Sequence, residues 1–386
     1  MKAMIPLSVP NLCRKEEEYI TKAVHEQWVS TAGSYIRDFE NAVAAYVDVP
    51  EAVACQSGTA GIHLSLIAAG VKAGDEVLVP TLTFIASVNP VRYIGAYPVF
   101  MDCDDSLSMD PQKVESFCRE QCHIRGGRLY NRGTGRPVTA LICVHVFGNL
   151  GDVEALSDIA DKYHLTLIED ACEALGSRWQ TGRYTGKMAG TVGKIGVYSF
   201  NGNKIITTGG GGMIVSHDKE LLERCRHLST QAKKDTLYFI HDEIGYNYRM
   251  TNLQAAMGLA QLELLERFIK IKEENYRKYC AAGIKLLSFN DGIRPNYWFY
   301  SYPTNYRDGC IRYLAENRIQ SRPVWALIHT LEPYRQMEAW QIEKAIYFYN
   351  RIVNIPCSTS LSETELKKVC DTLRAFEEEQ EGRKDG

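Results

Sequence analysis

One lysine in this chain stands in a setting that favours covalent chemistry. Lys204 lies among apolar and small residues, shortly before a run of four glycines at positions 209–212. The residues on either side, 197–200 and 213–215, have the apolar pattern of short buried strands. An amine held among buried strands loses part of its preference for the charged form and can attack a carbonyl carbon. Lys204 is therefore a candidate for forming a Schiff base.

A carboxylate follows a second predicted strand. Asp170 comes at the end of the apolar stretch 165–169, and open α/β sheets bind ligands at the carboxyl ends of their strands. A buried carboxylate needs a partner, and a protonated pyridine nitrogen would be one. A ring kept charged in this way withdraws electrons from a carbon attached through an imine. The alternative for Asp170 is a helix cap at the turn after the strand.

A third segment could seat a phosphate. Ser57, Gly58 and Thr59 follow a predicted strand and open a predicted helix, where backbone N–H groups and the helix dipole attract anions. The Thr59 hydroxyl adds a donor, and Ser199, just ahead of the lysine segment, could add another. Small residues open many helices, so this segment alone is a weak indication. The order phosphate seat, carboxylate and lysine is the one that pyridoxal 5'-phosphate requires.

Composition narrows the class of protein. The chain has 386 residues, 45% of them hydrophobic and 24% charged, which is ordinary for a globular protein large enough for two domains. A net charge of −3 gives no general attraction to nucleic acid or to an anionic membrane. No apolar run reaches membrane-spanning length, and the N-terminal stretch lacks the apolar core of a signal peptide. We therefore expect a cytoplasmic enzyme with neither nucleic acid nor membrane as a partner.

The twelve cysteines are scattered along the chain and are predicted to be reduced, mostly buried thiols. Cys118, Cys122 and His123 superficially suggest metal ligands. No second pair completes a tetrahedral set, so we expect no metal site.

The elements that must position these residues alternate between strand and helix over the first three-fifths of the chain. This predicts an α/β fold with a mostly parallel sheet covered on both faces. Strands are expected at 53–55, 76–80, 97–103, 139–146 and 165–169, and helices at 57–69, 83–93 and 152–163.

A long helix expected over 253–272 opens a region of different character. After Gly283 this region is rich in aromatic residues, and it ends in a charged helix at 363–379. We therefore expect a large cofactor-binding domain over residues 1–255 and a smaller α+β domain over residues 256–386.

Residues 122–137 break the alternation. They contain Arg125, Arg128, Arg132 and Arg136 among glycines. One interpretation is a mobile, solvated surface loop. The other is an anion-recognition loop, because guanidinium groups suit phosphate oxygens. The sequence leaves both open.

Motifs spread over most of the chain carry a family resemblance. They are Trp28-Val-Ser-Thr-Ala-Gly33, Ser57-Gly-Thr-Ala60, Pro80-Thr-Leu-Thr-Phe84, Glu169-Asp-Ala-Cys-Glu173, Ser199-Phe-Asn-Gly-Asn-Lys204 and Gly245-Tyr-Asn-Tyr-Arg-Met250. Through them the chain resembles the DegT/DnrJ/EryC1/StrS sugar aminotransferases, pyridoxal-phosphate enzymes of the aspartate-aminotransferase fold, fold type I. Val144-His-Val-Phe-Gly-Asn149 and the lysine segment are similar to the branch that aminates sugar nucleotides for bacillosamine or legionaminic acid.

The resemblance implies a role for each matching cofactor residue. Lys204 would be the Schiff-base lysine, and Asp170 would hold the pyridine nitrogen. Gly58, Thr59 and Ser199 would hold the phosphate.

Three further residues would complete the cofactor site. Phe84 would stack on the ring, with an ordinary core aromatic as the alternative. Glu173 stands where relatives carry Gln, His or Glu near the ring hydroxyl. Asn247 would reach the phosphate of a neighbouring subunit, which implies a homodimer with shared active sites. A simple turn residue is the alternative for Asn247.

The substrate side is implied less sharply. Trp28, Ser30 and Asn149 would contact the substrate, with its nucleotide extending outward past Trp28 and Ser30 toward the arginines of 122–137. Arg249 and His329 match substrate-side positions of the family, and His329 could equally be a hydrogen-bonded core histidine.

The implied activity is transfer of the amino group of L-glutamate, with release of 2-oxoglutarate, to the 4-keto carbon of a nucleotide-linked 4-keto-6-deoxy sugar. The alternatives are a dehydratase of the same family and a non-catalytic cofactor-binding regulator. Many family members have histidine where Asn201 stands, whereas members that dehydrate replace the lysine itself. The intact Lys204 therefore favours transamination. UDP or GDP as the nucleotide and the substituent at C2 of the sugar stay open.

Overall fold

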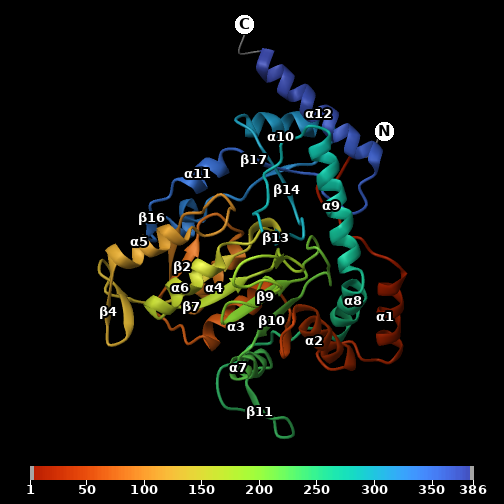
Figure 1. Cartoon of the computed structure of the whole chain (residues 1–386). Coiled ribbons are helices and arrows are strands. Elements are labelled where there is room, and N and C mark those ends of the chain that lie inside the picture. The colour runs from red at the N-terminus through yellow and green to blue at the C-terminus, as the bar shows by residue number, and fades with distance from the viewer. Residues whose placement is uncertain (1–3, 383–386) are drawn as a thin grey trace.

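The computed structural model describes residues 4–382, and its largest element is a ten-stranded sheet (Figure 1). In their order across the sheet, eight strands are β1 Glu51–Cys55, β10 Gly212–Ser216, β9 Ile195–Ser199, β7 Thr166–Asp170, β6 Pro137–Val144, β2 Glu76–Pro80, β3 Tyr97–Met101 and β16 Ala339–Trp340. β10 runs antiparallel to β1 and β9, whereas each neighbouring pair from β9 to β16 is parallel. The mostly parallel sheet predicted from the sequence is confirmed.

Helices cover both faces of this sheet. In β2, Val77 and Val79 belong to the same core cluster as α3 (Gly58–Ala68), whereas Leu78 packs in the cluster of α5 (Pro111–Gln121). Successive side chains of a strand point to opposite faces, so a strand buried on both sides reads as a continuous apolar run. The other helices that flank this sheet are α2 Ser34–Val47, α4 Asn89–Tyr93, α6 Val153–Tyr163 and α7 Lys219–Ser229. Outside them, α8 Asn252–Leu262 packs on α2 and on α1 Arg14–His25.

The arginine-containing segment forms a hairpin, so the mobile loop, one of the two interpretations that the sequence left open, is not what the structure shows. Its strands are β4 Cys122–Arg125 and β5 Arg128–Asn131. Gly126 and Gly127 make the turn with φ of 56° and 75°, values that glycine adopts without steric cost. The Arg125 guanidinium lies 4.5 Å from the ring centre of Tyr130. The polar residues of this segment, which suggested a loop in the sequence, form the exposed face of the strand pair β4–β5.

The predicted helix over 83–93 is interrupted. The structure has the 3-10 turn η1 (Ile85–Ser87) followed by the separate short helix α4. Pro90 lies in the first turn of α4, where its missing N–H costs nothing, whereas in a continuous helix it would remove a hydrogen bond.

The predicted helix over 253–272 is also two helices. α8 ends at Leu262 and α9 (Leu265–Ala281) begins after Glu263 and Leu264. Neither glycine nor proline marks this break in the sequence. Instead, the Glu263 carboxylate accepts a hydrogen bond of 2.7 Å from the hydroxyl of Tyr19 on α1. The break between α8 and α9 therefore coincides with a tertiary contact to α1, which helix propensity cannot reveal.

The C-terminal part has its own small antiparallel sheet. Its strands, in order, are β14 Tyr300–Pro303, β17 Ile352–Ile355 and β15 Arg322–Pro323. Its helices are α10 Arg307–Glu316, α11 Lys344–Tyr349 and α12 Glu363–Gly382, with the 3-10 turns η3 Ile328–Thr330 and η4 Glu332–Tyr334. The remaining strand pairs are β8 Arg178–Trp179 with β13 Ile293–Arg294, and β11 Lys233–Asp235 with β12 Ile240–His241. Within residues 4–382 no helix has the length and apolar character needed to cross a membrane.

Several contacts join the two parts of the chain. The expected boundary after residue 255 falls inside α8, which packs on α1 and α2. β16 extends the large sheet beside β3, and Ile5 forms a bridge with Ile319. The two-domain division at residues 1–255 and 256–386 therefore stays a prediction.

A close backbone approach beside β9 gives a test of this packing. A methyl group on Gly196 would overlap with the carbonyl oxygen of Gly190. We expect Gly196→Ala to destabilise the cofactor-free protein by about 3 kcal/mol, because neither backbone segment can yield. Urea unfolding followed by tryptophan fluorescence measures this. Gly202→Ala is the control, since open space surrounds Gly202, and equal unfolding midpoints for the two variants would contradict the packing described.

Candidate active site

A cavity of about 750 Å³ lies at the carboxyl edge of the large sheet. β7 and β9 end at this edge, and α3 begins here directly after β1. The predicted cofactor residues that line it are Gly58, Thr59, Phe84, Asp170, Glu173, Ser199 and Lys204. The C-terminal part closes the other side with residues that include Arg322, Trp325 and Asn354. The fold therefore brings together residues that lie far apart in the sequence, such as Gly58, Lys204 and Asn354.

The first turn of α3 has the geometry of an anion seat. The Ser57 side chain caps the helix by accepting a hydrogen bond of 3.0 Å from the N–H of Ala60. The N–H groups of the first turn that precede Ala60 lie at the positive end of the helix dipole. A side chain on Gly58 would clash with the Cys172 sulfur at 2.6 Å and the Ser199 Cβ at 3.0 Å, so glycine is needed for α3 to start this close to the ends of β7 and β9. Ser199 ends β9 beside it and also lines the cavity.

Asp170 is held rigidly and faces the cavity. Its Oδ2 accepts a hydrogen bond of 2.6 Å from the Ser87 hydroxyl, and its Oδ1 accepts one of 3.0 Å from the N–H of Cys172. Only 3% of the residue is exposed. The helix cap considered from the sequence is not what the side chain does, since its partners are a hydroxyl and one turn N–H. A buried carboxylate with this support can hold a protonated ring nitrogen.

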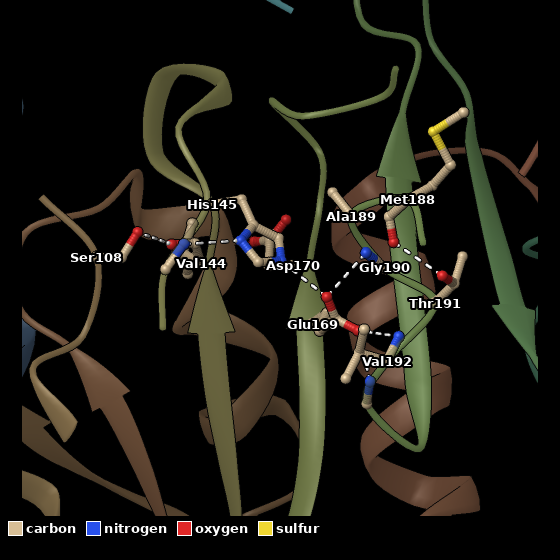
Figure 2. A network of polar contacts seen from close by, with 12 residues as sticks. Ser108, Val144, His145, Glu169, Asp170, Met188, Ala189, Gly190, Thr191 and Val192 are labelled. Carbon is tan, nitrogen blue, oxygen red and sulfur yellow. Dashed lines mark hydrogen bonds and ion pairs between the residues drawn. The ribbon is translucent and has the colours of Figure 1, made fainter. Parts of the chain in front are cut away.

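The neighbouring Glu169 faces the other side of β7 (Figure 2). Its carboxylate accepts hydrogen bonds from the ring of His145 at 2.8 Å and from the N–H groups of Gly190 and Val192 at 2.8 and 2.7 Å. Burial alone would raise the pKa of Glu169, but the bonds from His145 and the backbone lower it below its ordinary value. The N–H of Gly151 donates to Nδ1 of His145, so the ring donates to Glu169 through Nε2.

This anchor was missed from the sequence. Glu169 and Asp170 are adjacent acidic residues, and only strand alternation tells which of them faces the ligand. His145 lies in a motif used for the family resemblance, but its partner lies 24 positions away.

The amine of Lys204 makes two close contacts at the bottom of the cavity, which we call the cavity floor. Its Nζ lies 3.6 Å from Oε1 of Glu173 and 4.1 Å from the ring centre of Trp298. Its side chain is 11% exposed. Glu173 in turn accepts a hydrogen bond of 2.9 Å from the N–H of Phe147. Burial raises the pKa of Glu173 to about 7, with Lys204 and the Phe147 N–H opposing a larger rise.

These residues fit pyridoxal phosphate. The N–H groups at the start of α3 suit a phosphate, the supported carboxylate of Asp170 suits a ring nitrogen, and Lys204 lines the same cavity. Phe84 is 50% exposed at the cavity wall, so it is no ordinary core aromatic and is free to stack on a ring.

The predicted substrate residues lie outside this cavity in the single chain. Trp28 and Ser30 are exposed on the segment between α1 and α2. Asn149 is buried, and its side chain accepts from the N–H of Asn290 and donates to the carbonyl of Ser106. These bonds hold loops together, and contact of Asn149 with a substrate stays a prediction.

Three further predicted residues also lie away from the cavity. Arg249 pairs with Glu40 at 2.9 Å, and the ring of His329 forms a bond of 2.6 Å with the Thr81 hydroxyl. Burial lowers the pKa of His329, as in a packed core histidine. Asn247 is exposed, and contact with a partner subunit stays a prediction.

The arginine hairpin lies at the opposite edge of the sheet from the cavity. β5 pairs with Pro137 and Val138, the first residues of β6, whereas the cavity lies where the parallel strands end. Arg136 stacks on Tyr97 at 3.7 Å and lies 3.9 Å from Glu76, the first residue of β2. The proposal that the nucleotide of a bound substrate reaches these arginines within one chain is therefore wrong.

The pKa of Glu173 gives a test of the cavity floor. We expect the cofactor-free wild type to lose about 2–3 kcal/mol of stability, relative to Glu173→Gln, as the pH rises from about 4.5 to about 7. In this range the unfolded carboxyl ionises while the buried one keeps its proton. Urea unfolding at each pH measures the difference. Glu18→Gln on the exposed face of α1 is the control, and parallel stability curves for wild type and Glu173→Gln would contradict the assignment.

Comparisons with known proteins show the family of this chain. The family model described as DegT/DnrJ/EryC1/StrS aminotransferase family matches residues 10–374. The GDP-perosamine synthase of Escherichia coli O157:H7 is 37% identical over 380 residues, covering 96% of this chain and 98% of the relative. The UDP-4-amino-4,6-dideoxy-N-acetyl-beta-L-altrosamine transaminase of Campylobacter jejuni serotype O:23/36 is 28% identical over 386 residues, with 96% of each chain covered.

Comparison with solved structures points to the same family. The crystal structure of a DegT DnrJ EryC1 StrS aminotransferase from Brucella abortus superposes with a TM-score of 0.86 at 27% identity, over 94% of this chain and 95% of that chain. The predicted transferase fold is thereby confirmed, together with the cofactor. This chain belongs to the DegT/DnrJ/EryC1/StrS aminotransferase family and is a pyridoxal-phosphate-dependent sugar-nucleotide aminotransferase.

Proposed function

We propose that the enzyme moves the amino group of L-glutamate to the 4-keto carbon of a 4-keto-6-deoxy sugar, an N-acetylated hexose linked to UDP or GDP. The observation that carries this is one cavity that holds an amine, Lys204, a supported carboxylate, Asp170, and the anion seat at α3. The names of two relatives point to the substrate class. One is a GDP-perosamine synthase, and the other is a transaminase named for a UDP-linked 4-amino-4,6-dideoxy sugar. We place the reaction in the biosynthesis of surface glycans or nonulosonic acids.

Each cavity residue has one task in this proposal. Bound pyridoxal phosphate would supply a ring that withdraws electrons from the reacting carbon. The first turn of α3, with the Thr59 and Ser199 hydroxyls, would hold the phosphate, and Phe84 would cover one face of the ring. Asp170 would keep the ring nitrogen protonated.

Lys204 would move the proton at the reacting carbon of the substrate. Its Nζ must be neutral to accept a proton, and Glu173 lies 3.6 Å away with a pKa raised to about 7 by burial. Glu173 can therefore exchange a proton with Nζ near neutral pH. The two half-reactions, with L-glutamate and with the keto sugar, would share this one set of groups.

We propose a homodimer with shared active sites as the working form. The hairpin β11–β12 projects from the molecule (Figure 1), and its tip is strongly apolar. Leu237, Tyr238 and Phe239 are 74%, 74% and 67% exposed, and Ile244, just before the segment of Asn247, is 85% exposed. Exposed apolar clusters of this kind mark protein interfaces. A second copy that covers them would bring Asn247 near the partner's cavity.

Lys204→Ala tests the function. We expect the variant to retain pyridoxal phosphate only non-covalently, so that borohydride reduction attaches none to the protein. We also expect it to release no 2-oxoglutarate from L-glutamate with a panel of UDP- and GDP-linked 4-keto-6-deoxy sugars. The control is Lys194→Ala, an exposed lysine paired with Asp218. Turnover by Lys204→Ala at the wild-type rate would overturn the proposal, and the wild-type panel identifies the nucleotide.

Mixing two inactive variants tests the shared site. Asn247→Ala and Lys204→Ala should each lose most activity alone. Refolding them together should restore about a quarter of wild-type activity, because half of the dimers are mixed and each mixed dimer has one complete site. Activity no higher than the mean of the two parents would show that Asn247 serves its own subunit or none.

A further inference from the structure

Trp298 contacts both the reactive amine and the backbone that carries it. Its indole ring centre lies 4.1 Å from Nζ of Lys204, and its Nε1–H donates a hydrogen bond of 2.7 Å to the carbonyl of Asn203. Trp298 is 2% exposed, so water does not compete at these contacts. We propose that Trp298 is a positioning residue for Lys204, holding its amine in place between the two half-reactions; this inference rests on the proposed function.

The need for such a residue follows from the chain around Lys204. Residues 200–211 connect β9 to β10 without a helix or strand, and Gly202 has open space around it. Fixing one rotamer of a long lysine side chain and the backbone that carries it both cost entropy. Trp298 comes from the C-terminal part and fixes both at once, the backbone through the indole N–H and the amine through the ring.

Trp298 is itself tied from three sides. The buried ammonium of Lys272 on α9 donates to the carbonyl of Trp298 at 3.0 Å and to that of Cys357 at 2.6 Å. The N–H of Trp298 donates to Asn296 at 3.0 Å, and Asn296 donates in turn to the carbonyl of Glu173 at 2.8 Å. The two side chains that contact Nζ of Lys204, from Trp298 and from Glu173, are thus linked through one asparagine.

Lys272 is otherwise unexplained. It is 4% exposed, and none of the residues 4–382 offers it a carboxylate partner; burial lowers its pKa. A buried cation held by two carbonyls and the ring of Tyr300, whose centre lies 5.6 Å from Nζ, is costly. Its two carbonyl bonds join the segment of Trp298 to the end of β17, which accounts for its place in the fold.

A ring suits this task better than a second acid. A cation is attracted to an aromatic face without a directed hydrogen bond, so the amine stays close yet can turn toward the substrate carbon. A carboxylate in the same place would hold Nζ in one direction and add a negative charge beside Glu173 and Asp170.

The test compares Trp298→Leu, which removes the ring and the N–H, with Trp298→Phe, which keeps a ring. We expect Trp298→Leu to lower kcat about tenfold while KM for L-glutamate changes less than twofold, and Trp298→Phe to recover most of kcat. In the cofactor-free protein, brief acetylation with mass spectrometry should label Lys204 of Trp298→Leu at least about threefold more than wild type, because one face of the amine is uncovered. The matched control is Tyr302→Phe, a buried aromatic of β14 that contacts Glu377 and not Lys204.

A kcat for Trp298→Leu within twofold of wild type would overturn the inference, as would a fall in kcat that Trp298→Phe shares in full. If the wild type performs no transamination, the proposed function fails by itself. The acetylation arm then decides alone: equal labelling of Lys204 in wild type and Trp298→Leu overturns the inference, and raised labelling supports it.

Discussion

The site depends on how two adjacent acids at the end of β7 divide their tasks. Glu169 turns away from the cavity, where His145 and backbone N–H groups satisfy its charge within the protein. Strand alternation then places Asp170 on the opposite face, supported by Ser87 and open to a ligand. A buried carboxylate without partners would rotate or neutralise, so the Glu169 anchor fixes the end of the strand on which Asp170 is presented.

The second constraint is the charge balance at the cavity floor. Lys204 lies between a carboxylate and an indole, and both are held by backbone contacts distant in the sequence. The N–H of Phe147 that binds Glu173 belongs to a residue with φ of 57°, and Gly148 after it has no room for a side chain beside Asn296. The backbone strain at Phe147 is thus offset by the hydrogen bond that its N–H donates to Glu173, the acid beside Lys204.

Local patterns predicted the parts of the site that lie in regular elements. The strand before Asp170, the helix that opens after Ser57 and the lysine between two core strands were all read from apolar runs and small residues, and the sheet and fold are confirmed. The contacts that connect them were not predictable, because Trp298, His145 and Ser87 reach the site from other elements. Their sequence surroundings carry no mark of these partners.

The misplaced arginine hairpin has the same cause. The arginines of the hairpin looked like an anion site because charge is visible in a sequence, whereas their stacking on Tyr130 and Tyr97 at the far edge of the sheet is not. One measurement tests most directly whether this cavity transfers an amino group to C4 of a nucleotide sugar. With L-[15N]glutamate and a 4-keto-6-deoxy sugar nucleotide, NMR of the product should show 15N bonded to C4. A product that lacks 15N, or carries a deoxygenated carbon without nitrogen, would contradict it.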